Sequence, residues 1–312
     1  MVKEEFYFDS RDGESSLHAV RYRPEDESQI RCILQVVHGM AEYVERYEEF
    51  ARFLTGKGFL VTGEDHLGHG KSVGEKGSYG YFCEQDPATV LVRDVHRLKK
   101  LTEEKYPNVP YIIMGHSMGS FIARNYLCRY GSGISAAVIM GTGMQPRSTL
   151  KMAKAAAKVQ KLFRGSRHTS RLIDKLAFGS YGKRVSHPRT PWDWLSRDQE
   201  RVDSYIADPM CGFTFTVNGF ETLFELVSRL HNPQNLGAIP KMLPVFLVSG
   251  DADPVGDYGN GVHKAYESLV AAGLVNIKLK MYKGGRHELL NETNRDEVMK
   301  DILDWAQSTV LK

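Results

Sequence analysis

Residues 111–119, Tyr-Ile-Ile-Met-Gly-His-Ser-Met-Gly, join an apolar run to a Gly-x-Ser-x-Gly pattern. The apolar run predicts a buried strand, and the apolar positions that follow over 121–127 have helical spacing. A turn this sharp between a strand and a helix leaves no room for a side chain at Gly115 or Gly119, and it exposes the hydroxyl of Ser117. We therefore interpret Ser117 as a nucleophile, against the alternative of a glycine-rich structural turn.

Strand-like and helix-like segments alternate along most of the chain. Strands are predicted near 6–8, 17–22, 32–37, 59–62, 111–114, 136–140, 245–249 and 277–282. Helices are predicted near 47–55, 87–105, 262–271, after Ser117, and from residue 296. This alternation indicates an α/β fold with a mostly parallel sheet and helices on both of its faces.

The stretch 144–237 interrupts this alternation. It is rich in helical patterns, basic residues and aromatic residues, and glycines and prolines suited to linkers flank it on both sides. We predict that it is a helical cap inserted into a catalytic core made of residues 1–143 and 238–312. The aromatic residues of this stretch suit either an acyl channel or ordinary packing of the cap.

A serine nucleophile needs a base within hydrogen-bond reach, and the base needs a third group to orient it. In a parallel sheet these groups are expected on loops at the carboxyl ends of strands. His287 meets this condition, because a Gly-Gly turn joins it to the strand 277–282. Asp251 and Asp253 both follow the strand 245–249 and are the candidate acids.

Negative charge that develops on a carbonyl oxygen needs two backbone N–H donors nearby. The residue after the nucleophile, Met118, supplies one of them. The loop His38-Gly39-Met40-Ala41-Glu42 follows the third predicted strand, so the N–H of Met40 is the second candidate. We expect His38 and His116, which flank this region, to pack and hydrogen-bond rather than to catalyse.

Five motifs in order resemble those of the monoacylglycerol lipase and lysophospholipase family of α/β-hydrolases, within the serine aminopeptidase-like superfamily. They are the loop at 38–42 with Arg46-Tyr47 after it, Asp65-His66-Leu67-Gly68-His69-Gly70-Lys71-Ser72, the turn at 115–119, Gly250-Asp251-Ala252-Asp253, and His287. The resemblance covers the whole catalytic core and implies an α/β-hydrolase fold. In this family the catalytic acid stands three residues after the glycine that corresponds to Gly250, so the resemblance favours Asp253 over Asp251.

The resemblance implies a serine hydrolase that cleaves the carboxylic ester of a single-acyl lipid, a monoacylglycerol or a lysophospholipid, through a Ser117-His287-Asp253 triad and an acyl-enzyme. A short-chain carboxylesterase and an aminopeptidase of the same superfamily are the alternatives. An aminopeptidase needs cap carboxylates for a free ammonium group, and Glu200, Asp203 and Asp208 lie near one another in the sequence. A binding module without catalysis is the alternative from another class.

The remaining patterns indicate no cofactor and no metal. His66 and His69 lack a third positioned ligand, and Asp65 stands where a phosphate-binding loop requires its first glycine. The four cysteines are scattered and are predicted to be free thiols. No apolar run approaches the roughly 18 residues of a membrane span, and the acidic N-terminus does not suit a signal peptide, so we expect a cytoplasmic protein.

Charge is concentrated in one segment. Between residues 147 and 201 fourteen Lys and Arg residues stand against four Asp and Glu residues, although the net charge of the chain is only +3. Apolar residues recur in this segment at helical spacing, which favours amphipathic helices with a cationic face over a nucleic-acid-binding arm. That face is either simply solvated or attracts anionic groups, through transient contact with the lipid headgroups of a membrane surface or by binding anionic substrates. The sequence leaves the oligomeric state open.

Overall fold

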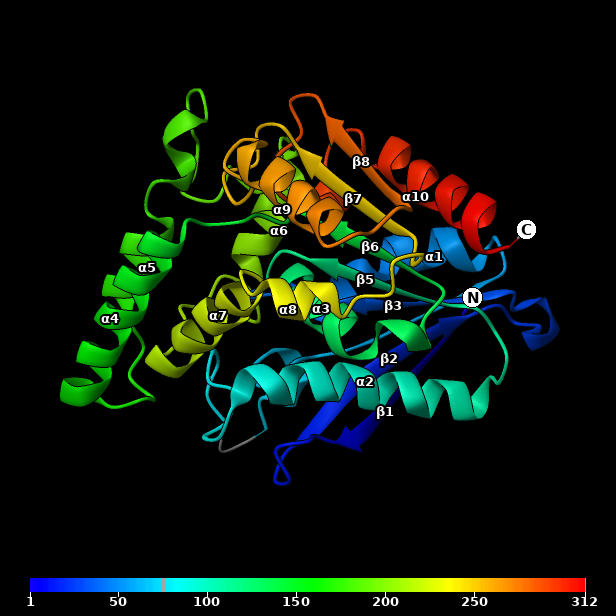
Figure 1. Cartoon of the computed structure of the whole chain (residues 1–312), viewed down its shortest axis with the longest axis horizontal. Helices are drawn as coiled ribbons and strands as arrows, with labels where there is room; N and C mark the ends of the chain where they lie inside the picture. Colours follow the sequence, from blue (N-terminus) through cyan, green and yellow to red (C-terminus); the bar gives the residue numbers. More distant parts are fainter. Residues whose placement is uncertain (75–76, 312) are drawn as a thin grey trace.

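The computed structural model describes residues 1–74 and 77–311 and contains an eight-stranded sheet (Figure 1). The strands lie in the order β1 (Val2–Asp9), β2 (Ser16–Arg23), β4 (Phe59–Glu64), β3 (Cys32–Val37), β5 (Tyr111–His116), β6 (Ala136–Met140), β7 (Val245–Gly250) and β8 (Ile277–Tyr282). The first two pairings are antiparallel, and the pairings from β4 to β8 are parallel. The predicted α/β-hydrolase fold is confirmed.

Helices cover both faces of the sheet. One face packs against α1 (Glu48–Thr55) and α10 (Arg295–Val310), and the other packs against α2 (Pro87–Lys105), α3 (Met118–Tyr130) and α9 (Asn260–Ala271). The central strands are therefore buried on both sides, which explains why β3 reads as an unbroken apolar run apart from Gln35.

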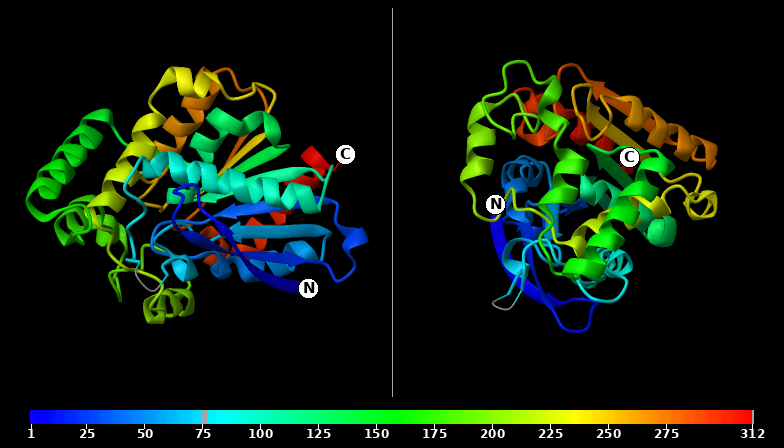
Figure 2. Two further views of the ribbon diagram at one scale, coloured as in Figure 1. Left: turned by 90° about the horizontal axis from the view of Figure 1, so that it is seen from below. Right: turned by 90° about the vertical axis from the view of Figure 1, so that its left-hand side faces the viewer.

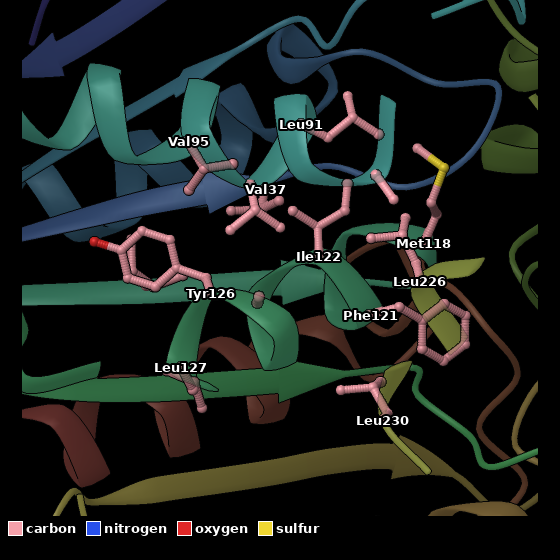
Figure 3. Close-up of a cluster of buried hydrophobic side chains, with 14 of the residues drawn as sticks. Val37, Leu91, Val95, Met118, Phe121, Ile122, Tyr126, Leu127, Leu226 and Leu230 are labelled. Carbon is pink, nitrogen blue, oxygen red and sulfur yellow. The ribbon is translucent and has the colours of Figure 1, made fainter. Parts of the chain in front are cut away.

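The first turns of α3, which follow Ser117, are fixed by a dense apolar cluster. Met118, Phe121 and Ile122 point into it from α3, and side chains of α2, β3 and the helix at 217–229 surround them (Figure 3). Removing one large side chain from such a core costs about 2–5 kcal/mol, so this packing holds the start of α3 firmly against the sheet.

The chain between β6 and β7 carries five α-helices: α4 (Arg147–Arg164), α5 (Arg171–Phe178), α6 (Gln199–Ala207), α7 (Val217–Arg229) and α8 (Pro233–Gly237). Of these, α7 packs against α2 and α3 of the core, whereas α4 packs on α7. The pair α4 and α5 stands out from the body of the molecule (Figures 1 and 2). We keep the name cap for residues 144–237.

No helix in the described part of the chain combines the length and the apolarity that a membrane crossing requires.

A buried carboxyl lies under the turn between β1 and β2. Asp94 on α2 accepts hydrogen bonds from the Ser10 hydroxyl at 2.8 Å and from the Arg11 N–H at 2.6 Å. Burial nevertheless raises the pKa of Asp94 to about 7 from its ordinary value of 3.8. Below about pH 4 the folded and unfolded chains both carry this proton, whereas between pH 4 and 7 only the folded chain does. The Asp94 carboxyl therefore costs more stability as the pH rises through this window.

Asp94→Asn is expected to raise the free energy of unfolding, and by more at pH 8 than at pH 5, because the amide has no proton to lose. Each tenfold difference in proton affinity is worth about 1.4 kcal/mol. Urea denaturation of both proteins at the two pH values measures the difference. A gain that does not change with pH would show that the pKa of this carboxyl is not raised.

Candidate active site

Ser117 occupies the sharp turn between β5 and α3. Its backbone angles, φ 54° and ψ −121°, are a strained conformation for a residue with a side chain. The turn requires glycine on both sides: a Cβ on Gly115 would lie 2.3 Å from the Gly119 oxygen, and a Cβ on Gly119 would lie 1.9 Å from the Val37 oxygen. The predicted strand, turn and helix are all present, and the Ser117 side chain lines a large cavity.

His287 and Asp253 are brought together by two neighbouring loops, after β8 and β7. The Nδ1 atom of His287 lies 2.9 Å from Oδ2 of Asp253, and both side chains are buried. The other carboxylate oxygen of Asp253 accepts the Val255 N–H at 2.8 Å. Asp251 points elsewhere and accepts the Gly284 N–H at 2.6 Å. The geometry therefore pairs the histidine with Asp253 rather than with Asp251.

The cavity has a volume of about 1050 Å³ and lies between the core and the cap. Ser117, His287, Met40 and Met118 form its floor, and apolar side chains of α4, α5 and α7 form much of its wall, among them Leu150, Ala153, Ile173, Leu176, Leu223, Phe224 and Val227. Asp253 does not line it and lies behind His287. Such a cavity can hold a ligand with a long apolar portion against Ser117.

The loop that carries Met40 is held in place by histidines. The Ala41 N–H donates to Nε2 of His69 at 3.2 Å, while Nδ1 of His69 lies 2.9 Å from the Leu67 oxygen. Burial lowers the pKa of His69 to about 3, so the ring is neutral and can accept that hydrogen bond. Met118 is the first residue of α3, and its N–H has no carbonyl partner within the helix. Both residues that carry the candidate donors line the same cavity as Ser117.

Asp65 and His66, which lie in the same loop as His69, are engaged within the protein. Asp65 accepts from Nδ1 of His18 and from the N–H groups of Val44 and Lys71, each at 2.9 Å. The Nε2 atom of His66 lies 3.2 Å from the His38 oxygen. These contacts tie the loop at 65–72 to the loop at 38–42.

A buried ionic network, which the sequence reasoning missed, joins the Met40 loop to the His287 loop. The Nδ1 atom of His116 lies 3.0 Å from Oε1 of Glu42, and its Nε2 atom lies 3.3 Å from the His287 oxygen. Arg46 donates to Glu42 at 2.8 Å and twice to Glu288, at 2.8 and 2.7 Å. The sequence contained one indication of this network, since Glu42 and Arg46 belong to the motif at 38–47, but that motif does not predict which residues they contact.

Both nitrogens of His116 face acceptors, an arrangement that favours the doubly protonated ring. Burial opposes charge on His116 and on Glu42, but their mutual attraction and hydrogen bond raise the pKa of His116 and lower the pKa of Glu42. His116 thus has the hydrogen-bonding role that we expected of it, and His38 likewise bonds to the Gly39 oxygen and to the His66 N–H.

Comparison with known proteins agrees with this architecture. The family model described as "Serine aminopeptidase, S33" matches residues 28–294. The human monoglyceride lipase is 31% identical over 282 residues, which cover 88% of this chain and 82% of that protein. The monoacylglycerol lipase of Mycolicibacterium smegmatis is 28% identical and covers 89% of each chain. A thermostable carboxyl esterase from Bacillus coagulans superimposes with a TM-score of 0.91 at 31% identity, over 99% of both chains.

These relatives are lipases and esterases, so this chain is an ester-hydrolysing enzyme and the alternative of a binding module drops out. The match to the family model spans both parts of the predicted catalytic core, and the cavity floor described above lies within it. The chain belongs to the monoacylglycerol lipase family of α/β-hydrolases.

Proposed function

We propose that this enzyme hydrolyses the ester of a single-acyl lipid, a monoacylglycerol or a lysophospholipid, with Ser117, His287 and Asp253 as its catalytic triad. The observation that carries the proposal is that Ser117 and His287 line the floor of one large and mostly apolar cavity, with Asp253 paired to His287 from behind. At about 1050 Å³ the cavity is at the upper end of the range for ligand pockets, which suits a long acyl chain better than a short one.

The proposed reaction has two steps. Nε2 of His287 takes the proton of the Ser117 hydroxyl as Oγ bonds to the ester carbonyl carbon, and the carbonyl oxygen becomes an oxyanion. The N–H groups of Met40 and Met118 donate to that oxyanion, while Asp253 stabilises the imidazolium. The C–O bond then breaks, and His287 returns the proton to the leaving alcohol.

In the second step water attacks the acyl-enzyme with His287 again as base, and the fatty acid leaves as Ser117 regains its proton.

The cavity wall also bears on the alternatives. Among the residues that the structure describes, those that line the cavity do not include Glu200, Asp203 or Asp208. Asp203 instead pairs with Arg189, and Asp208 accepts from the Tyr43 hydroxyl at 2.7 Å. An ammonium-binding site for an aminopeptidase is therefore not built from these carboxylates. Lys183 and Arg189 do line the wall, and we propose that this basic rim contacts the headgroup.

A hydrolysis panel tests the substrate class. It compares a monoacylglycerol, a lysophospholipid, p-nitrophenyl esters of increasing chain length and aminoacyl naphthylamides, each beside Ser117→Ala. The proposal expects Ser117-dependent release of medium or long acyl chains, and the preferred headgroup shows whether the basic rim selects phosphate. Turnover of short esters alone would instead identify a short-chain carboxylesterase, and turnover of aminoacyl amides alone an aminopeptidase.

We also propose that α4 and α5 contact a membrane surface of anionic lipids. Six large apolar side chains of this pair are 58–81% exposed: Met152, Val159, Leu162, Phe163, Leu172 and Leu176. Basic residues accompany them along α4, of which Lys154 and Lys161 pair with glutamates on α7. Met152 and Leu176 also line the cavity, so the apolar face is continuous with the proposed acyl site.

Leu162→Glu together with Phe163→Glu is expected to weaken binding to phosphatidylglycerol vesicles by more than tenfold. Burying one such side chain in lipid is worth about 1.5–3 kcal/mol, and the new carboxylates are repelled by the anionic surface. Co-sedimentation measures the binding, and turnover of a short water-soluble ester should not change. Met242→Glu, at an apolar residue outside the cap that is 67% exposed, is the control and should leave vesicle binding unchanged. Equal vesicle binding by the parent protein, the double variant and the control variant would refute the proposed membrane contact of α4 and α5.

A further inference from the structure

Arg124 on α3 is a fully buried arginine. Its guanidinium contacts backbone, hydroxyl and thioether acceptors, and no carboxylate in the described part of the chain forms a salt bridge with it. Burial lowers the pKa of Arg124 to about 10, so the group is still charged at neutral pH. Placing a charge in the interior without a counter-ion lowers stability, and replacing such a group by an apolar side chain is often neutral or stabilising.

The acceptors of Arg124 all lie in the first cap linker, residues 141–146, which joins β6 to α4. Nη1 donates to the Gly143 oxygen at 3.0 Å and lies 3.5 Å from the Thr142 hydroxyl. Nη2 lies 3.6 Å from the sulfur of Met144. The guanidinium thus fixes three successive residues of this linker against α3.

The linker in turn reaches the turn at Ser117. The Thr142 hydroxyl lies 2.8 Å from the Ser120 hydroxyl, which donates to the Ser117 carbonyl at 2.6 Å. The Ser117 N–H donates to the oxygen of Met140, the residue before the linker, at 3.1 Å. Because a strained backbone persists only where its surroundings hold it, these hydrogen bonds are part of what keeps φ of Ser117 positive.

The linker also touches His287 and the loop that carries Asp253. A Cβ on Gly141 would lie 3.2 Å from Cε1 of His287, so the linker backbone packs directly against that ring. The Gln145 amide donates to the Val255 oxygen at 3.3 Å, and the Val255 N–H donates to Asp253 at 2.8 Å. One short segment therefore contacts the loops that carry all three residues.

We propose that Arg124 is a positioning residue, which holds the first cap linker in the conformation that aligns Ser117, His287 and Asp253. This inference rests on the proposed triad. A misplacement of about 1 Å among reacting groups costs on the order of 10²-fold in rate, so loosening the linker should slow the chemical step. Substrate binding should change less, because neither Arg124 nor its three hydrogen-bond partners line the cavity.

Arg124→Met tests the proposal, because it keeps apolar volume and removes the charge and the hydrogen bonds. We expect kcat to fall about 10- to 100-fold, KM to change less than about threefold, and the thermal midpoint to stay the same or rise. The rate of Ser117 labelling by a fluorophosphonate should fall in parallel with kcat. Arg129→Met, an exposed arginine on the same helix, is the matched control and should leave all of these values unchanged.

Thr142→Val and Ser120→Ala interrupt the same chain of hydrogen bonds without altering the charge, and they keep the test valid if Arg124→Met does not fold. Each should lower kcat, and adding Thr142→Val to Arg124→Met should lower it by less than the product of the two single effects. Arg124→Lys, which restores a charged donor, should recover part of the loss.

Unchanged kcat and labelling in the folded Arg124 and Thr142 variants would overturn the positioning role. A loss of activity that merely follows a loss of folded protein would overturn it too. Failure of the triad itself is separate, since it shows as activity retained by Ser117→Ala.

Discussion

Ser117→Ala is expected to lower ester hydrolysis by about 10³- to 10⁶-fold, measured as kcat/KM on a monoacylglycerol and on a p-nitrophenyl ester. Without the hydroxyl no acyl-enzyme forms, and only water held near the N–H groups of Met40 and Met118 is left to attack the carbonyl. The fold should be unaffected, because alanine occupies the same backbone conformation and the glycines beside it are unchanged.

Two controls make this result specific. Ser204→Ala removes an exposed hydroxyl on α6 and should keep full activity. Circular dichroism and the thermal midpoint should be the same for both variants and the parent. Activity retained by a folded Ser117→Ala would refute the assignment of the nucleophile, and a fluorophosphonate probe that labels another residue would identify the true one.

Asp253→Asn is expected to be the second most damaging change, with a loss of about 10³- to 10⁴-fold in kcat. The neutral amide no longer stabilises the imidazolium that forms on His287. Its NH₂ group can also donate to Nδ1, which would place the ring proton on Nε2 and leave no base facing Ser117. The loss should appear in kcat more than in KM, because Asp253 does not touch the cavity.

Asp251→Asn provides the matched comparison. Asp251 is exposed and accepts one hydrogen bond from the Gly284 N–H, which an amide oxygen can also accept. We expect its kcat to change by less than about threefold. A larger loss at 251 than at 253 would contradict the pairing of Asp253 with His287 and would move the proposed acid to the other aspartate.

Most of the fold could be predicted from the order of apolar runs and glycines along the chain. The apolar pattern around the glycines at 115 and 119 predicted a strand, a turn and a helix, since a sharp turn of this kind leaves no room for a Cβ at either glycine, and the structure has all three elements. The apolar runs predicted the parallel strands for the same kind of reason: a strand buried on both faces must be apolar at nearly every position. The candidate active-site residues followed, because carboxyl ends of parallel strands meet at one edge of the sheet.

Contacts between segments that are distant in the sequence could not be predicted from sequence patterns. Asp251 and Asp253 both follow β7, and the residues alone left the two open. Only the path of the neighbouring loop after β8 places His287 against one of them. The ionic network that joins Glu42 and Arg46 to Glu288 spans more than 240 positions of sequence, so no local spacing signals it.

The sequence therefore determined the local backbone geometry, because glycines, strand-forming runs and helix starts set it. The pairing of the catalytic acid, the volume of the cavity and the contacts of the buried Arg124 were decided by tertiary structure. Each depends on which side chains packing brings within hydrogen-bond distance, and hydrogen bonds are lost over about an ångström of displacement.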